Sequence, residues 1–176
     1  MTLPAALRCL KSGLIACLLV TTESSIAVAS DSPARAIEQQ FKRGETALAQ
    51  QNLTLALARQ PGDVALRFLQ GVMLSAGGST GEAVALFERL TQEFPDLPEP
   101  YNNLAVLQAA AGRIDAAREL LETALRLDPG YRTAQENLGD VFARLAQRAY
   151  EAAAGQHPEI SLQRKLRMAR ELAQPR

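Results

Sequence analysis

Residues of the same kind recur along this chain at intervals of 34 positions. A period of this length indicates that one supersecondary unit has been copied and that the copies stack against one another. Because each copy contacts mainly its neighbours, such an array presents a long surface rather than a single reaction centre. We therefore expect a binding face. The recurring residues form four sets: Gly44, Gly78 and Gly112; Ala49, Ala83 and Ala117; Leu53, Phe87 and Leu121; Pro61, Pro95 and Pro129.

The hydrophobic pattern within each unit is helical. Apolar residues are spaced three and four positions apart, which places them on one face of a helix, and the alternation typical of strands is missing. The chain is also rich in Ala, Leu, Glu, Gln and Arg, which favour helices. The sequence therefore predicts an all-α fold. The spacing is clearest in Ala83, Leu86, Phe87 and Leu90, and again in Ala117, Leu120, Leu121, Ala124 and Leu127.

Cap and turn residues divide the unit that begins near Asp63 into two helices. Asp63 is the predicted N-cap of the first helix, and Gly78 permits the left-handed backbone conformation that ends it. Ser79, with Glu82 three residues later, has the form of a capping box for the second helix. Pro95 ends that second helix. The unit is thus predicted to be a helix hairpin.

These residues resemble those of the tetratricopeptide repeat (TPR) family, whose unit is a 34-residue helix hairpin. The resemblance implies a right-handed α-solenoid of such hairpins. It also implies that the small residues Gly71, Ala105 and Gly139 let the second helix of a hairpin lie against the first. The match is closest over 98–131, through Tyr101, Leu104, Ala105, Gly112, Ala117, Leu121, Ala124 and Pro129.

The resemblance divides the chain into six segments and is weaker at both ends of the array. The segments are a signal peptide over 1–29, a degenerate TPR over 30–63, full TPRs over 64–97 and 98–131, a partial TPR or one long helix over 132–158, and a basic capping helix over 159–176. In the capping helix, the residues Leu162, Leu166, Ala169 and Leu172 form one apolar stripe among basic residues.

The first 29 residues have the layout of a secretory signal. Arg8 and Lys11 precede a short apolar run over 13–20, and small residues end the segment at 27–29. The apolar run is well below the roughly 20 residues that span a bilayer as a helix. We therefore expect an exported bacterial TPR protein in the periplasm, with no membrane span after cleavage. One alternative remains open: 14–17 resembles a lipobox, in which case Cys17 is lipidated and the protein is a membrane-anchored lipoprotein.

The charge balance gives no reason to expect a nucleic-acid partner. The chain has 19 basic and 19 acidic residues, and cleavage after residue 29 removes Arg8, Lys11 and Glu23, which leaves 17 and 18. A nucleic-acid-binding domain normally carries a clear basic excess.

The residues that enzymes and metal sites need are scarce. Both cysteines, Cys9 and Cys17, lie in the segment to be removed, and His157 is the one histidine. Neither a Cys–His nucleophile nor a histidine-rich metal site can be assembled from this set. No glycine-rich phosphate loop is present. We expect no catalytic residue, no metal and no cofactor.

The resemblance places the partner-binding surface on the first helix of each hairpin. Asn103 and Asn137 are one period apart, so we expect them side by side, where amides both donate to and accept from a peptide backbone. A purely local role for these two amides remains open. The predicted surface comprises Phe68, Leu69 and Val72 at an apolar end, Asn102, Asn103 and Val106 in the middle, and Glu136, Asn137 and Asp140 at an acidic end.

The resulting functional prediction is a non-catalytic protein–protein interaction module. We expect a periplasmic adaptor or scaffold that docks a peptide segment or a partner protein in a cell-envelope process. Two alternatives remain open: an outer-membrane lipoprotein assembly factor lipidated at Cys17, and a structural module that associates with itself into a homo-oligomer.

Overall fold

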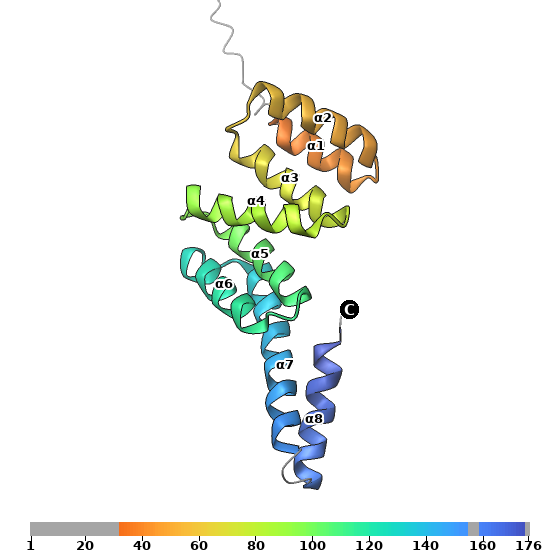
Figure 1. The fold of residues 1–176 in the computed structure, drawn as a ribbon, viewed down its shortest axis with the longest axis vertical. Coiled ribbons are helices and arrows are strands. Elements are labelled where there is room, and N and C mark those ends of the chain that lie inside the picture. The colour runs from red at the N-terminus through yellow and green to blue at the C-terminus, as the bar shows by residue number, and fades with distance from the viewer. Residues whose placement is uncertain (1–31, 155–158, 175–176) are drawn as a thin grey trace, which may run out of the picture. The chain divides into compact units, whose positions relative to one another are not determined.

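The computed structural model describes residues 32–154 and 159–174, and this part of the chain is entirely helical (Figure 1). The predicted signal segment, both cysteines and His157 lie outside the described residues. Within them, eight helices are packed in consecutive pairs, which confirms the predicted fold class. The helices are α1 (Pro33–Lys42), α2 (Thr46–Arg59), α3 (Val64–Ala76), α4 (Thr80–Glu93), α5 (Pro98–Ala110), α6 (Ile114–Leu127), α7 (Arg132–Ala154) and α8 (Ile160–Ala173).

The turns inside the first three hairpins depend on glycine. Gly44, Gly78 and Gly112 have φ angles of 81°, 83° and 78°, a region in which residues with a side chain are strained. After α3, the amide of Ser79 donates to the carbonyl of Leu74 at 3.0 Å, which closes the helix end. The recurring glycine therefore marks a left-handed turn in each of these three hairpins.

Helix α3 begins as the sequence predicts, whereas α4 does not. The Asp63 carboxylate accepts a hydrogen bond from the amide of Leu66 at 2.9 Å and so caps α3. Ser79 occupies the N-cap of α4, but its side chain makes no capping hydrogen bond. The predicted capping box between Ser79 and Glu82 is therefore wrong. The backbone of Ser79, with φ −76° and ψ 55°, is set by the preceding glycine turn.

Three clusters of buried apolar side chains hold successive hairpins together. Each cluster combines residues from both helices of a hairpin with residues from the next hairpin. Phe87, Leu90 and Leu121 are among the largest core side chains, and all three are almost fully buried. The first helices α1, α3, α5 and α7 also contact one another in order. Neighbour-to-neighbour packing of this kind is typical of solenoid repeats.

The small residue predicted on each first helix has a packing role in two of three hairpins. Gly71 is buried against the ring of Phe87, and Ala105 is fully buried in the third cluster with Leu121. Gly139, by contrast, is exposed, and a side chain added there would meet nothing within 4 Å. The prediction that Gly139 permits close helix packing is wrong, because α7 has no second helix packed against that position.

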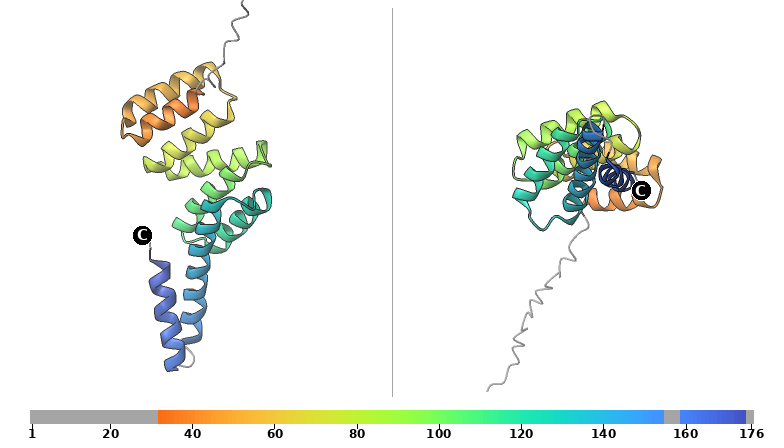
Figure 2. Two further views of the ribbon diagram at one scale, coloured as in Figure 1. Left: turned by 180° about the vertical axis from the view of Figure 1, so that it is seen from behind. Right: turned by 90° about the horizontal axis from the view of Figure 1, so that it is seen from below.

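The last two helices depart from the repeat. The structure has one 23-residue helix, α7, where the sequence left a partial repeat or a long helix open. Helix α8 packs on α7 and on no other described helix, and it lies beside α7 in both Figure 1 and Figure 2. Leu166 and Ala169 are buried in this contact, whereas Leu172, predicted in the same stripe, is exposed.

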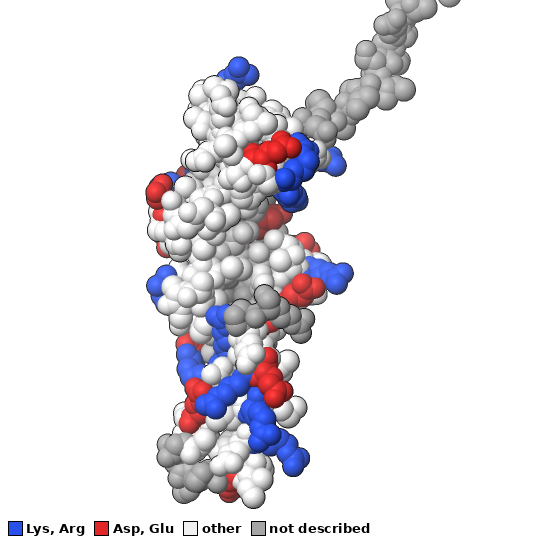
Figure 3. Space-filling model, turned by 90° about the vertical axis from the view of Figure 1, so that its right-hand side faces the viewer, with Lys and Arg blue, Asp and Glu red and all other residues white. Residues whose placement is uncertain are grey.

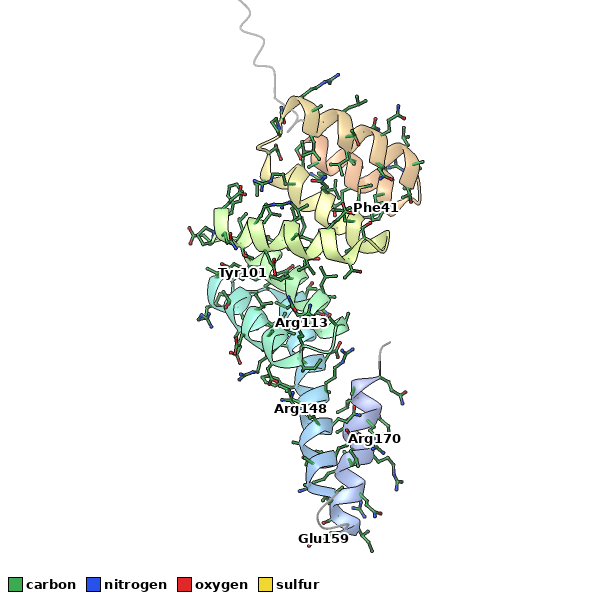
Figure 4. The ribbon with its side chains drawn as sticks, in the orientation of Figure 1. Phe41, Tyr101, Arg113, Arg148, Glu159 and Arg170 are labelled. Carbon is green, nitrogen blue, oxygen red and sulfur yellow. The ribbon has the colours of Figure 1, made fainter. Side chains whose placement is uncertain are left out.

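Ion pairs at the surface link α7 to its neighbours. Arg148 donates to both carboxylate oxygens of Asp115 on α6, at 2.8 and 3.0 Å, and Arg170 on α8 donates to Glu151 at 2.9 Å. Both arginines can be followed in Figure 4, Arg148 on α7 and Arg170 on α8. The hydrogen bond from Arg148 lowers the pKa of the Asp115 carboxyl group. On the face seen in Figure 3, charged side chains gather over the α7–α8 end of the described chain.

The contact between Gly71 and Phe87 yields a stability prediction. A methyl group added at Gly71 would lie 2.7 Å from Cζ and 2.8 Å from Cε1 of Phe87, so the ring must move. We expect Gly71→Ala to lower the free energy of unfolding by about 1 to 3 kcal/mol, the usual range for overpacking. The change in the free energy of unfolding is measured by urea denaturation, with circular dichroism as the readout.

Gly139→Ala is the matched control, since it makes the same change at the equivalent position of α7. Open space surrounds this glycine, and alanine is the better helix former by about 1 kcal/mol. We expect Gly139→Ala to leave stability unchanged or to raise it. Equal destabilisation by both substitutions would contradict the packing role assigned to Gly71.

Candidate functional site

A hollow of about 180 Å³ opens between the first helix of the third hairpin and the long helix that follows it. Helix α5 contributes Ala105, Val106, Ala109 and Ala110, and Leu121 of α6 lies at the back. Helix α7 contributes Asn137, Asp140, Val141 and Arg144. Three of the predicted partner-binding residues, namely Val106, Asn137 and Asp140, therefore lie around one opening.

Helical spacing explains why these residues meet. The α7 residues are three or four positions apart along the helix, which puts them on one face. The four α5 residues also include pairs three or four positions apart, so they share one face of that helix, and three of the four are alanines. Small side chains opposite the longer side chains of α7 leave the space between the helices unfilled. Val106 is 46% exposed at the rim, which makes it an accessible apolar contact beside the opening.

The asparagines of the predicted surface make hydrogen bonds within the fold. The amide of Asn137 donates to the side-chain oxygen of Asn102 at 2.8 Å, and Asn102 is only 4% exposed. Asn103 instead donates to the carbonyl of Glu99 on its own helix at 2.9 Å. Both amides thus make a hydrogen bond within the fold, the local role that the sequence left open, and their role as peptide ligands stays a prediction.

Arg144 is held by the end of α5. Its Nη1 donates to the carbonyl of Ala109 at 3.1 Å, one of the last carbonyls of that helix. A guanidinium group at a helix C-terminus is electrostatically favourable. The position of Arg144 leaves Asp140, four residues earlier, without an ion pair or hydrogen bond to any described residue. The hollow thus presents an available carboxylate beside an anchored cation.

The predicted apolar end of the surface packs in or against the core in this structure. Leu69 is buried in the first cluster, and Phe68 and Val72 pack against the second cluster. The Phe68 ring lies 5.7 Å from the Phe87 ring, measured between centroids. The assignment of the buried Leu69 as a partner contact is therefore corrected to packing. Phe68 and Val72 are half-buried, and their partner role stays a prediction. Asn102 is buried and is reassigned in the same way as Leu69.

Glu136 lies at the exposed edge of the predicted surface and does not line the hollow. Its carboxylate accepts a hydrogen bond from Nε of Arg132 at 3.1 Å, one helical turn away. An exposed pair of this kind contributes little to stability. Asp140 is therefore the acidic residue available at this end of the surface.

The arrangement of side chains around the hollow is suited to binding. Across residues 32–154 and 159–174, no group of three or more His, Cys, Asp or Glu side chains is placed to hold a metal ion. Over the same residues, no helix is both long enough and apolar enough to cross a bilayer. What the hollow offers is an apolar floor, one exposed valine and a row of amide, carboxylate and guanidinium groups. Such a surface matches an extended peptide backbone with small side chains.

Sequence reasoning missed two features of this site. The alanines at 109 and 110 of α5 create the hollow, and their small size was the available indication. Arg144 reaches the end of α5 across the helix interface, a contact between positions 35 residues apart. A separation of 35 residues is one repeat length plus one. A contact between these two positions is therefore understandable once the packing of neighbouring hairpins is known.

Comparison with known proteins agrees with this geometry. Two family models described as tetratricopeptide repeat match residues 33–98 and 74–138, which together span more than half of the chain. The chain is 34% identical over 94 residues to the TPR repeat-containing thioredoxin TTL4 of Arabidopsis thaliana. That match covers 51% of this chain but only 14% of the relative.

Solved structures share the fold at low sequence identity. The structure of TTC0263, a TPR protein of Thermus thermophilus, is similar with a TM-score of 0.59 at 19% identity, over 78% of this chain and 79% of that one. A mutant of MamA is similar with a TM-score of 0.54 at 20% identity, over 79% of this chain and 84% of that one.

A third similar structure is that of Naa15/Naa10 bound to HypK-THB, with a TM-score of 0.56 at 17% identity. It covers 80% of this chain and 22% of that chain. The 34-residue hairpins, the glycine turns and the family matches lead to one conclusion: the chain is a tetratricopeptide repeat protein, a class of module that binds protein partners.

Proposed function

We propose that this protein is a non-catalytic adaptor that binds an extended segment of a partner protein across α5 and α7. The observation that carries the proposal is the hollow of about 180 Å³ between these helices, with exposed Val106 at its rim and the available carboxylate of Asp140 beside it. Apolar burial supplies most of the affinity of such contacts, and a few polar groups supply orientation.

The side chains around the hollow fit a peptide backbone. Asp140 accepts from a backbone amide or from a basic side chain of the partner. Arg144 uses one N–H on the Ala109 carbonyl and keeps others for a partner carbonyl. An apolar side chain of the bound segment enters the hollow beside Val106 and Val141. The similar structure of Naa15/Naa10 bound to HypK-THB is itself an assembly with a protein partner, which supports a binding role.

The proposal also includes export to the bacterial periplasm and a role in a cell-envelope process. It rests on the sequence of residues 1–29, with its basic start, apolar run and small residues before position 30. Lipidation at Cys17 is the competing proposal for the same segment.

The exposed apolar residues of α8 favour self-association as a second candidate. Ile160 is 82% exposed and Met168 is 57% exposed, and Leu172 is exposed on the same helix. Contact between two copies through this surface removes apolar area from water.

Val106→Glu tests the binding surface, since it places a charge at the rim of the hollow. We expect crosslinked pull-down from envelope extracts to recover at least about tenfold less of the specific partner, as for a disrupted contact at the centre of an interface. Leu127→Glu is the control, because Leu127 is 37% exposed on α6 and does not line the hollow. A partner recovered equally by both variants would exclude the α5–α7 surface.

The mass of the mature N-terminus tests the location. Cleavage after Ala29 leaves Ser30 as the first residue, whereas lipoprotein processing leaves an acylated Cys17 that incorporates labelled palmitate. We expect Ser30 and no palmitate. An intact Met1 on the protein isolated from cells would refute both forms of processing.

Light scattering after size-exclusion chromatography tests self-association. If α8 mediates it, the wild type forms a dimer or larger oligomer at micromolar concentrations, and Met168→Glu with Leu172→Glu restores the monomer. A wild-type monomer over the whole micromolar range removes self-association as a function, and leaves the adaptor proposal intact.

A further inference from the structure

We propose that the seam between α2 and α3 is a second docking site, which takes an uncharged segment of a partner protein with an inserted leucine-sized side chain. A hollow of about 430 Å³ opens along this seam, more than twice the volume of the hollow between α5 and α7. Phe41 of α1, labelled in Figure 4, is one of its lining residues. The proposal does not depend on the adaptor surface described above.

Two apolar residues that pack in the third seam have small counterparts in this seam. Two periods further along the chain, the positions of Thr46 and Gly77 hold Ile114 and Leu145. Ile114 and Leu145 pack against the third apolar cluster and fill the seam between α6 and α7. Thr46 and Gly77 instead line the open hollow. The first seam therefore lacks apolar volume that the third seam has.

The floor of the hollow is apolar. Leu53 is buried there in the first cluster, and Leu57 and Met73 pack against that cluster while lining the opening. Methionine adapts its shape readily and makes favourable contacts with varied apolar side chains. An inserted side chain would thus contact apolar side chains on the floor of the hollow.

The two sides of the hollow carry amides that are not used by the fold. Gln50 stands on α2 and Gln70 on α3, and neither side chain makes a hydrogen bond with another described residue. A glutamine amide can donate to a carbonyl and accept from an N–H at once. These groups match the backbone of an extended segment that crosses the seam.

The absence of charge in the lining determines the class of segment. None of the described residues that line this hollow has a charged side chain. A lysine or glutamate inserted here would be removed from water without a counter-charge, which is strongly unfavourable. Leucine or methionine carries no such penalty. The complementary occupant is a neutral segment with an apolar side chain.

Two of the α3 residues that line this hollow lie on a different face of the helix from Phe68 and Val72. Gln70 and Leu74 line it, and each is two positions from Phe68 and Val72, which is roughly 200° around the helix. Met73 is therefore a reporter of this seam, and Met168 on α8 is an exposed reporter far along the chain. The chain has only one other methionine, Met1.

Methyl NMR of the full-length chain with labelled methionine tests the proposal. The probe is the capped peptide acetyl-Ser-Gln-Leu-Ser-Gln-Leu-Ser-amide, compared with versions in which both leucines are lysine or glutamate. We expect the leucine peptide to shift the Met73 methyl signal saturably and to leave Met168 unmoved. The charged peptides should bind at least about tenfold more weakly, because their charges stay unpaired. Equal shifts at Met73 and Met168, no shift at Met73, or equal affinity of all three peptides would overturn the proposal.

The decisive variant fills the seam between α2 and α3 with the residue types found in the seam between α6 and α7. Thr46→Ile with Gly77→Leu should abolish the shift at Met73 while keeping the melting temperature. The φ of Gly77, −80°, matches the −78° of Arg43 and the −81° of Ala111 at the equivalent turns, where residues with side chains stand. A Cβ added at Gly77 would lie 3.2 Å from the carbonyl oxygen of Met73, so that contact must adjust by a few tenths of an ångström. Unchanged binding by the filled, folded variant would refute the site.

A second variant keeps the test open if the filled protein fails to fold. Gln50→Glu adds a carboxylate to the exposed side of α2 and should turn the preference toward the lysine peptide by about tenfold, the reversal expected for a paired charge. No change in preference would count against the site. Val106→Glu should leave the Met73 shift intact, so failure here and failure of the adaptor surface are separately visible.

Discussion

The contact of Phe87 with Gly71 sets the distance between the two helices of the second hairpin, and the rest of the array is built on such contacts. A large side chain on the second helix lies against a residue without one on the first. In the next hairpin, Leu121 and Ala105 share a buried cluster in the corresponding places. With this spacing fixed, the first helices come into contact with one another, and the surface between α5 and α7 follows.

The repeat made most of this fold predictable. Glycines 34 residues apart located the turns of the first three hairpins, and the prediction of helix hairpins was confirmed by the paired helices. The prediction failed where a residue of the right kind lacks its neighbour. Gly139 has the expected size, but nothing packs against it. A sequence pattern specifies which residue can be buried, whereas burial itself depends on what the fold brings to that position.

The sequence predicted which helix faces carry the candidate site, but it did not predict the contacts of the individual residues. Val106, Asn137 and Asp140 were assigned from their place on the first helices and do lie around one hollow. The hydrogen bond from Asn137 to Asn102 joins positions 35 residues apart, which the 34-residue period alone does not predict. The seam between α2 and α3 is the opposite case. Comparing equivalent positions reveals its missing volume, but only after the structure has shown which positions face each other.

The attachment of α8 has a consequence for how the protein comes apart. This helix rests on α7 alone among the described helices, so detaching it breaks one interface, whereas removing an internal helix breaks at least two. In a chain stabilised by nearest-neighbour terms, the terminal unit opens at the lowest free energy. The amides of α8 should therefore exchange with solvent hydrogen well before those of α4 or α5, and proteases should trim the carboxyl-terminal end while the hairpins around Phe87 stay folded.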